Sequence, residues 1–376
     1  IERGGSIFEA IAKNDILLHH PFQSFDDSVV RFVREAAEDP KVLALKMTLY
    51  RMSASSPVAA ALERAAERGK QVAAIIELRA RFDEEANIAW ARRLEKAGVH
   101  VVYGLPNYKI HGKACLVVRM EQGGIRRYCH MGTGNYNERT SRIYSDLGMF
   151  TARPEFGEDL SQFFNFLTGY TRPPQFNRLI LAPQSFRRAI TERIEREGRH
   201  AQEGKPARMI LKMNALVDPH IIGMLYEASQ RGVQVDLIVR GSCCLKPGVP
   251  GLSERIRALS IIDRFLEHAR IYHFANDGQP ETLLASGDLM PRNLDHRVEI
   301  CFPLVDPLLA EQVLDLLELQ LQDSTKGRVL GGDGSVQRRG LDPAGPPLAS
   351  QQRTYELGLL RSGATAVTHR LADLQG

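Results

Sequence analysis

The protein has 376 residues, and its 49 basic and 45 acidic side chains leave a formal net charge of only +4. That length exceeds the size at which one hydrophobic core usually stops growing, so two domains are expected. The small charge gives no sign of a nucleic-acid partner. The sequence also has no signal-like leader and no apolar run long enough to span a bilayer, which favours a soluble protein.

The cysteines and the first residue predict the setting of the chain. The five cysteines are odd in number, lie mostly in apolar runs and lack metal-ligand spacing, which predicts a reducing, cytoplasmic environment. Because the chain begins with Ile1 rather than Met, we expect it to be a piece of a longer protein.

In the first half, predicted strands alternate with predicted helices. Residues 41–50 are apolar and β-branched and predict a strand, whereas residues 55–69 have Ser56 as an N-cap and Gly69 at the end, a complete helix signature. A strand, a helix and a strand are predicted next, at 71–79, 83–98 and 99–104. Strands separated by helices of this length predict βαβ units and a mainly parallel sheet.

The stretch from 107 to 118 reads NYKIHGKACLVV and contains a histidine and a lysine two residues apart. Because side chains alternate faces along a strand, His111 and Lys113 are predicted to point to the same side. Taken alone, the pair fits either a chemical site or a hydrogen-bonded strand edge.

The second half repeats the order of the first. ILLHHPFQSF is echoed by LILAPQSF, LKM by LKM, and RGKQVAAIIELR by RGVQVDLIVRG, at a nearly constant offset. His268 aligns with His111, and Arg270 takes the place of Lys113. Downstream, GTGN at 132–135 aligns with ASGD at 285–288. Two half-sites of this kind can meet across a pseudo-twofold interface and form one active site with two histidines.

We therefore expect an α/β fold built from two copies of one domain, each a mixed, mostly parallel sheet flanked by helices. The first is expected at 1–170 and the second at 176–322, because the prolines in GYTRPPQ break any helix that enters the junction. Residues 323–350 are rich in Gly and Pro and lack an apolar period, so this part of the C-terminal segment 323–376 is expected to be flexible. The end of the chain predicts a short strand or helix of unknown role.

Two copies of His-x-Lys/Arg, each followed by a Gly-rich turn, resemble the phospholipase D superfamily, which uses one histidine as a nucleophile on phosphorus. That superfamily has an Asp five residues after the lysine, where this chain has Val118. Longer segments are similar to polyphosphate kinase of the first type, the bacterial enzyme that makes inorganic polyphosphate from ATP. They include LLHHPFQSF, ALKMTLYR, ELRARFDEEANIAWARRLEKAGVHVVYG, GTGNYNERTSRIYSDLG and MPRNLDHRVEICFPL. The resemblance covers about residues 1–322, the two C-terminal catalytic domains of that family.

The resemblance implies roles for individual residues. His111 matches the histidine that is phosphorylated, and His268 matches a second essential histidine. Matches to nucleotide or phosphate contacts are Tyr144, Arg240 and Arg297, and matches to the magnesium and phosphate site are Arg51 and Arg81. Since a guanidinium has no lone pair for Mg²⁺, we expect both of these arginines to contact the phosphates that the metal binds. The family also implies Mg²⁺ as cofactor, ATP, ADP and polyphosphate as partners, a homo-oligomer and peripheral membrane association.

The expected chemistry is attack by neutral His111 on the γ-phosphorus of ATP, followed by transfer of the phosphoryl group to polyphosphate. Lys113 and Arg270 would neutralise the transferred group, and His268 would hold phosphate or handle a proton on the leaving side. One alternative is a phosphodiesterase or nuclease of the phospholipase D type. Another is a catalytically incomplete fragment that only binds polyphosphate. Without the resemblance, Arg51 and Arg240 fit strand-end positions, Tyr144 fits a half-buried position in a strand, and Asn135 and Asp288 fit turns.

Overall fold

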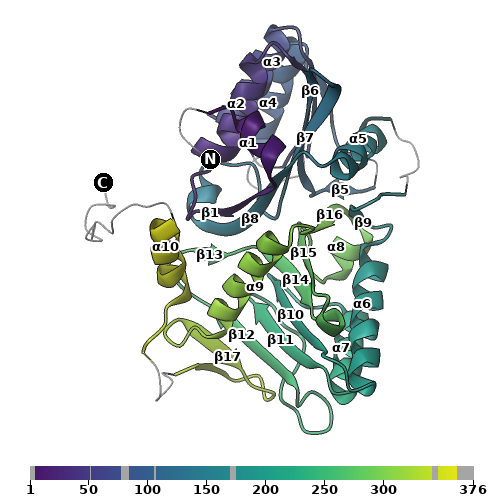
Figure 1. Ribbon diagram of the computed structural model, residues 1–376, viewed down its shortest axis with the longest axis vertical. Helices are drawn as coiled ribbons and strands as arrows, with labels where there is room; N and C mark the ends of the chain where they lie inside the picture. Colours follow the sequence, from purple (N-terminus) through teal and green to yellow (C-terminus); the bar gives the residue numbers. More distant parts are fainter. Residues whose placement is uncertain are drawn as a thin grey trace.

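The computed structural model describes residues 5–50, 52–77, 84–105, 107–169, 175–340 and 346–361. It shows two α/β units, one above the other in Figure 1, with the N-terminal unit in purple to blue and the second in teal to green. The junction predicted at GYTRPPQ lies largely outside the described residues, since 170–174 are not described.

The first unit is built around one sheet with the strand order β1-β8-β7-β6-β2-β3-β4. Its strands are β1 (Ile16–His20), β2 (Val42–Leu49), β3 (Gln71–Ile76), β4 (His100–Val102), β6 (Lys113–Glu121), β7 (Gly124–Gly132) and β8 (Tyr144–Thr151). Its helices are α1 (Ile7–Lys13), α2 (Arg31–Glu38), α3 (Pro57–Glu67), α4 (Glu84–Lys96) and α5 (Pro154–Gly169). The first four helices contribute to a core on one face of the sheet.

The sequence signals explain the clearest of these helices. In α3, the Ser56 hydroxyl accepts the N–H of Ala59 at 3.3 Å, and Pro57 occupies the first turn. Val58 and Leu62 are buried, as the helical spacing requires. The helix predicted over 55–69 is confirmed.

The second unit repeats the arrangement of the first. Its sheet has the order β9-β16-β15-β14-β10-β11-β12 when read from the other edge. These strands are β9 (Ile180–Ala182), β10 (Arg208–Met213), β11 (Gln234–Val239), β12 (Ile256–Ile261), β14 (Arg270–Phe274), β15 (Glu281–Ala285) and β16 (Arg297–Pro303). The helices are α6 (Phe186–Gln202), α7 (Pro219–Gln230), α8 (Pro291–Asp295) and α9 (Pro307–Leu321). The same strand order in both units confirms the duplication.

Both sheets are mixed, as expected, but parallel pairs do not make up most of them. Within each unit they are confined to β2-β3-β4 and β10-β11-β12, where a helix connects successive strands except between β11 and β12, which are joined by the loop 240–255. The pairs β6-β7, β7-β8, β14-β15 and β15-β16 are antiparallel. Consecutive strands without a long crossover between them can only fold back on each other, which explains the difference.

The units exchange one short strand each. β5 (Lys109–Ile110) pairs in parallel with β16 of the second unit, and β13 (Leu266–Glu267) pairs in parallel with β8 of the first. The N–H of His111 donates to the carbonyl of Val298 at 2.8 Å, and the N–H of His268 donates to that of Ser145 at 3.0 Å. Each histidine is therefore held against the sheet of the other unit.

One apolar cluster joins the two units around this exchange. It combines side chains from α5, such as Phe164, with side chains from α9, such as Leu317, and with residues of both sheets, such as Met149 and Ile300. A continuous core across the interface holds the two half-sites at a fixed separation.

The C-terminal segment contains more regular structure than expected. β17 (Gly327–Leu330) pairs with β12, β18 (Val336–Arg338) pairs with β17, and α10 (Ser350–Arg361) follows. Residues 323–350 were expected to be flexible and without regular structure. They contain the two paired strands β17 and β18. Their pairing extends the edge of an existing sheet, so it does not require an apolar period of their own.

Candidate active site

A cavity of about 530 Å³ lies where the two units meet. Both predicted histidines line it, together with five basic side chains: Lys109, Arg240, Arg270, Arg292 and Arg297. One carboxylate, Asp288, is also in the wall, and it is paired with Arg270 at 3.1 Å. A cavity with this lining carries an excess of positive charge and suits a highly anionic ligand.

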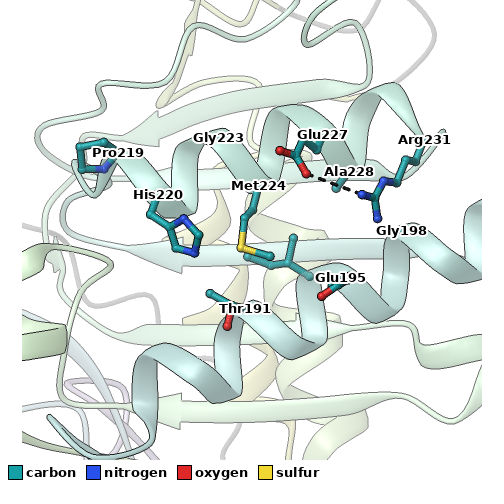
Figure 2. A pocket seen from close by; sticks show the side chains of 11 residues that line it. Thr191, Glu195, Gly198, Pro219, His220, Gly223, Met224, Glu227, Ala228 and Arg231 are labelled. Atoms are coloured by element: carbon teal, nitrogen blue, oxygen red, sulfur yellow. Dashed lines mark ion pairs between the residues drawn. The ribbon is translucent and has the colours of Figure 1, made fainter.

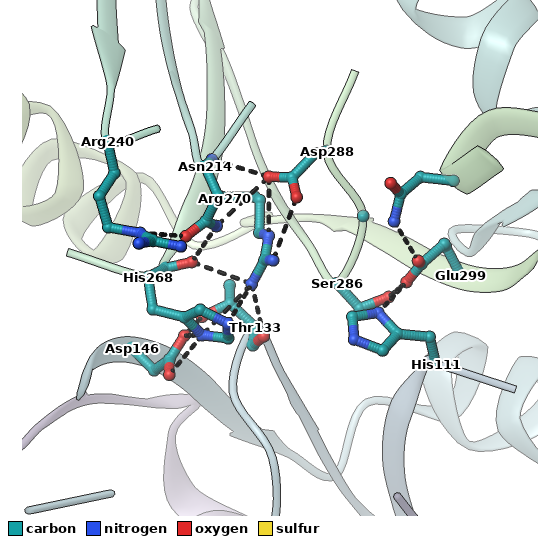
Figure 3. Close-up of polar contacts among 12 residues, drawn as sticks. His111, Thr133, Asp146, Asn214, Arg240, His268, Arg270, Ser286, Asp288 and Glu299 are labelled. Carbon is teal, nitrogen blue, oxygen red and sulfur yellow. Dashed lines mark hydrogen bonds and ion pairs between the residues drawn. The ribbon is translucent and has the colours of Figure 1, made fainter. Parts of the chain in front are cut away.

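His111 is oriented by a carboxylate from the second unit. Its Nδ1 lies 2.8 Å from Oε2 of Glu299, which is completely buried. Because a carboxylate can only accept, Nδ1 carries the proton and Nε2 keeps its lone pair. Burial lowers the pKa of His111 to about 3, so the ring is neutral at physiological pH. Figure 3 shows the second ring nitrogen turned toward the side on which His268 and Arg270 lie.

The orienting carboxylate is itself fixed. Ser286 donates its hydroxyl to Oε2 of Glu299, and Nδ2 of Asn293 donates to Oε1 at 2.6 Å. Burial raises the pKa of Glu299, but contacts with His111, Lys113 and Ser286 outweigh it and lower the pKa to about 2. The carboxylate is therefore ionised, and it holds a neutral imidazole in one tautomer.

His268 is held by the equivalent arrangement in the other half of the site. Its Nδ1 lies 2.9 Å from both oxygens of Asp146 in the first unit, and the hydroxyl of Thr133 donates to Asp146 at 2.6 Å. Burial is the main cause that lowers the pKa of His268, and Arg270 adds to it. The two halves differ at the ring: Nη1 of Arg270 lies against His268, 3.1 Å from Nε2 and 3.3 Å from Nδ1. For Nε2 of His111, the described part of the chain provides no hydrogen-bond partner.

The Gly-rich turns allow the carboxylates to approach. A Cβ placed on Gly134 would lie 2.3 Å from Oδ2 of Asp146, and a Cβ on Gly287 would lie 2.9 Å from Cγ of Glu299. Both distances are too short for a side chain to be accommodated without movement. The glycine in each turn is thus explained by the carboxylate that packs against it.

A tyrosine contacts each histidine. The ring centres of Tyr50 and His111 are 4.9 Å apart at 88°, and those of Tyr144 and His268 are 5.0 Å apart at 52°. Both tyrosines line the cavity. The predicted residue Tyr144 thus lies in the site, where it packs against His268.

The cations that were expected to pair with the histidines are both buried, and of the two only Arg270 lines the cavity. Lys113 is 1% exposed, donates to the carbonyl of His111 and lies 5.4 Å from the ring centre of Tyr50. Burial lowers the pKa of Lys113 well below its usual range. Arg270 is also buried and donates to the carbonyl of His268 at 2.9 Å and to Asp288.

The other predicted residues fall into two groups. Arg240 and Arg297 lie in the cavity wall, where Nε of Arg240 donates to Oδ1 of Asn214 at 2.7 Å. Arg51 and Arg81 lie outside the described residues. Within the described ranges, no cluster of His, Cys, Asp and Glu could hold a metal ion. The carboxylates near the cavity are already paired with histidine or arginine, so the described residues do not fit a protein-held Mg²⁺.

Sequence reasoning missed the carboxylates and the hydroxyls that hold them. Asp146 and Glu299 each stand 13 residues after the hydroxyl side chain of the Gly-rich turn, Thr133 or Ser286. This constant spacing in both copies was the signal available. Asp288, expected only to stabilise its turn, also accepts the N–H of Asn214 at 2.7 Å and pairs with Arg270.

A second hollow lies between α6 and α7 on the outer face of the second unit (Figure 2). It measures about 470 Å³ and is lined by residues such as Thr191, His220 and Met224. The ion pair drawn there joins Glu227 and Arg231 at 3.6 Å, and both side chains are partly exposed. Its lining has no histidine held by a buried carboxylate, so the interface cavity is the candidate active site.

Comparisons with known proteins identify the family of the chain. Residues 6–173 match the family model described as polyphosphate kinase C-terminal domain 1, and residues 179–351 match C-terminal domain 2. The chain is 51% identical over 370 residues to a polyphosphate kinase of Thermosynechococcus vestitus, covering 98% of this chain and 49% of that protein. It is 54% identical over 329 residues to one of Mycolicibacterium paratuberculosis, covering 88% and 45%. The chain thus spans about half the length of these relatives.

Solved structures show the same relationship. A polyphosphate kinase from Porphyromonas gingivalis superposes with a TM-score of 0.89 at 37% identity, covering 96% of this chain and 55% of the other. A phosphatidylserine synthase of Haemophilus influenzae superposes with a TM-score of 0.58 at 12% identity over 93% and 94% of the chains, which shows a shared fold alone. The chain belongs to the polyphosphate kinase family and contains its two C-terminal domains.

Proposed function

We propose that these two domains carry out the reversible transfer of the ATP γ-phosphate to inorganic polyphosphate through a phosphohistidine at His111. The observation that carries the proposal is the state of His111, whose proton is held on Nδ1 by Glu299 while Nε2 keeps a lone pair beside a cationic cavity. A neutral imidazole of this kind is a competent nucleophile at neutral pH. Relatives with 51% and 54% sequence identity to this chain are named polyphosphate kinase, which supports ATP and polyphosphate as substrates.

The transfer takes two displacements at phosphorus. First, Nε2 of His111 forms a bond to the γ-phosphorus while the bond to the β,γ-bridging oxygen breaks, and ADP leaves with that electron pair. Second, a terminal oxygen of polyphosphate attacks the same phosphorus, the P–N bond breaks and neutral His111 is restored. Glu299 stabilises the positive charge that the ring acquires in between. Both donor and product are phosphoanhydrides, which accounts for a reversible reaction.

The remaining groups bind and neutralise phosphate. Arg240, Arg270 and Arg297 present planar donors that match phosphate oxygens. An anionic phosphoryl group on His111 raises the pKa of Lys113, which burial lowers. Lys113 therefore adds a positive charge beside His111 during the transfer. His268 holds phosphate or moves a proton on the leaving side. Loss of one such donor is expected to cost about a hundredfold in rate.

Magnesium and the compartment belong to the same proposal. Because the described residues do not fit a protein-held Mg²⁺, we assign the ion to the nucleotide that carries it and route no step through it. All five cysteines are free, which supports a reducing, cytoplasmic setting. Among the described residues, no helix combines the length and apolar character that crossing a bilayer requires. Oligomerisation and peripheral membrane association stay predictions.

Labelling with [γ-³²P]ATP tests the proposal in the full-length protein. The label is expected on His111 as an acid-labile, base-stable adduct that is chased into polymer by unlabelled polyphosphate. His111→Ala should abolish both labelling and synthesis, whereas His100→Ala, on an exposed strand end, should change neither. Labelling or polymer formation by His111→Ala at the parent rate would sink the mechanism.

The same assay separates the alternatives. Hydrolysis of a phosphodiester without release of ADP would favour an enzyme of the phospholipase D type. Because the chain spans about half of its relatives, the 376-residue chain should be assayed beside the full-length protein, with polyphosphate binding measured on both. Binding without turnover by the shorter chain alone would identify it as a catalytically incomplete fragment.

A further inference from the structure

Helix α10, in the C-terminal segment, contacts β13 and the residue before it, directly ahead of His268. Gln351, in its first turn, is 4% exposed and makes three hydrogen bonds there. Its Nε2 donates to the carbonyl of Phe265 at 2.8 Å and to Oε1 of Glu267 at 2.7 Å. Its Oε1 accepts the N–H of Phe265 at 2.9 Å.

The two bonds to Phe265 take the place of a neighbouring strand. β13 has only two residues, and on its other side the N–H of Leu266 donates to Ile143 at 2.8 Å. A strand this short has too few ladder hydrogen bonds to hold its position alone. The amide of Gln351 offers one donor and one acceptor to the same residue, as a paired backbone would.

Glu267 links this contact to the interior. Its buried carboxylate forms an ion pair with Lys212 of β10 and accepts Nε2 of Gln320, on α9, at 3.0 Å. Lys212 in turn donates to Oε1 of Gln320 at 2.9 Å. In a fully satisfied buried network, loss of one donor leaves a costly unpaired acceptor. The residue after Glu267 is His268.

The start of α10 is anchored independently. Asp323 is completely buried, and its Oδ2 accepts the N–H of Ser350 at 2.8 Å and the Ser350 hydroxyl at 2.7 Å. Its Oδ1 accepts the N–H of Lys326 at 2.7 Å. The counterpart strand β5 is held differently, because the N–H of Ile110 donates to Glu77 of its own unit at 3.0 Å.

We infer that Gln351 is a positioning residue, which holds β13 so that His268 faces the cavity, and that α10 is thereby part of the active-site framework. The inference rests on the proposed function only for the part that His268 plays in transfer. The family model ends at residue 351, so nearly all of α10 lies beyond the matched domains.

The test compares neighbouring substitutions in the full-length protein. Gln351→Met keeps about the same volume and removes the amide, and Gln352→Met changes an exposed residue whose amide bonds Glu356 at 3.1 Å. Hydrogen exchange is measured on the peptide covering 263–270 and on one covering 107–113. In Gln351→Met, the amides of His268 and Ala269 should exchange at least about tenfold faster, with no change around His111. The transfer rate kcat should fall about 10- to 100-fold, with KM for ATP within about twofold.

Four outcomes would decide against part of this scheme. Unchanged exchange at 263–270 in Gln351→Met overturns the inference. Faster exchange with a full transfer rate overturns the positioning of His268. A parent protein that transfers no phosphate counts against the proposed function, and the exchange difference then decides alone whether Gln351 holds β13. Equal effects of Gln352→Met would also overturn the assignment to Gln351.

Discussion

The two half-sites have one scaffold and different chemistry. In both, a histidine on an exchanged strand is oriented by a carboxylate from the other unit, and that carboxylate is fixed by a hydroxyl from its own Gly-rich turn. The halves differ at the residue two positions on. Lys113 donates to the carbonyl of His111 and Arg270 donates to that of His268, but Arg270 also lies against the ring of His268, 3.1 Å from Nε2 and 3.3 Å from Nδ1. One duplicated frame thus yields one histidine with a guanidinium against its ring and one that, among the described residues, has none.

The position of Arg270 explains why a symmetric fold need not have two nucleophiles. Both carboxylates place the proton on Nδ1, so the tautomer is the same in both halves. What separates the described surroundings of the two rings is the guanidinium of Arg270, which lies against His268.

Removing each histidine should give unequal losses. We expect His111→Ala to lower polymer synthesis by more than about a thousandfold, because the covalent step disappears. His268→Ala should lose about a hundredfold and should still acquire label on His111. Rapid-quench measurement of labelling and of its chase into polymer checks both. Equal loss of labelling in the two variants would contradict the assigned division of roles.

Exchanging the carboxylates for amides probes the tautomers. Glu299→Gln no longer dictates a proton on Nδ1 of His111, so the labelling rate should fall about a hundredfold or more. Asp146→Asn acts through His268 and not on the nucleophile, so it should slow the labelling less than Glu299→Gln does. Single-turnover rates measure the two steps separately. Labelling slowed equally by both changes would argue against separate roles for the two carboxylates.

Acid should affect His111 less than it affects an ordinary histidine. With a pKa of about 3, folded His111 stays neutral at pH 5.5, where a free ring with a pKa of 6.5 would be about tenfold depleted in its neutral form. The first turnover of labelling, measured at saturating ATP, should therefore change less than about twofold between pH 7 and 5.5. A tenfold fall that fits a pKa near 6.5 would contradict this.

The same shift affects stability. Below pH 6.5 the unfolded chain takes up a proton at this histidine that the folded protein does not bind until about pH 3. Full stability is therefore present above pH 6.5, and the free energy of unfolding should fall as the pH drops through this window. His130, buried with a pKa of about 3, should act in the same direction. Urea unfolding of His130→Phe should show a shallower loss of stability with acid than the parent.

The glycines of the two turns should be sensitive in both halves. Gly134→Ala and Gly287→Ala push a Cβ into Asp146 or Glu299, which should cost about 1–3 kcal/mol in the free energy of unfolding. Gly223→Ala, in α7, meets no atom within 4 Å and should stabilise the protein by about 0.5–1 kcal/mol. Urea unfolding of the three variants measures this. A neutral result for both turn glycines would show that the carboxylates can move.

Local pattern in the sequence determined much of this protein. The caps of α3, the strand–helix alternation, the duplication, the alignment of His268 with His111 and the repeated turns are all features of short segments, and each was predictable. The predicted mostly parallel pairing failed because partner choice depends on how consecutive strands are connected. The strands β17 and β18 were missed because they extend an edge that lies far away in the sequence.

Only the tertiary structure decided which groups make the site work. Glu299 lies 188 residues from His111, and Asp146 lies 122 residues from His268, so no local spacing joins them. The exchange of β5 and β13 brings each pair together, and burial then makes the rings neutral and fixes their tautomers. Our proposal of His111 as the nucleophile depends on the guanidinium of Arg270, which lies against the ring of His268. The sequence determined that two histidines would be present, and folding determined what each can do, because proton position and charge depend on neighbours that are distant along the chain.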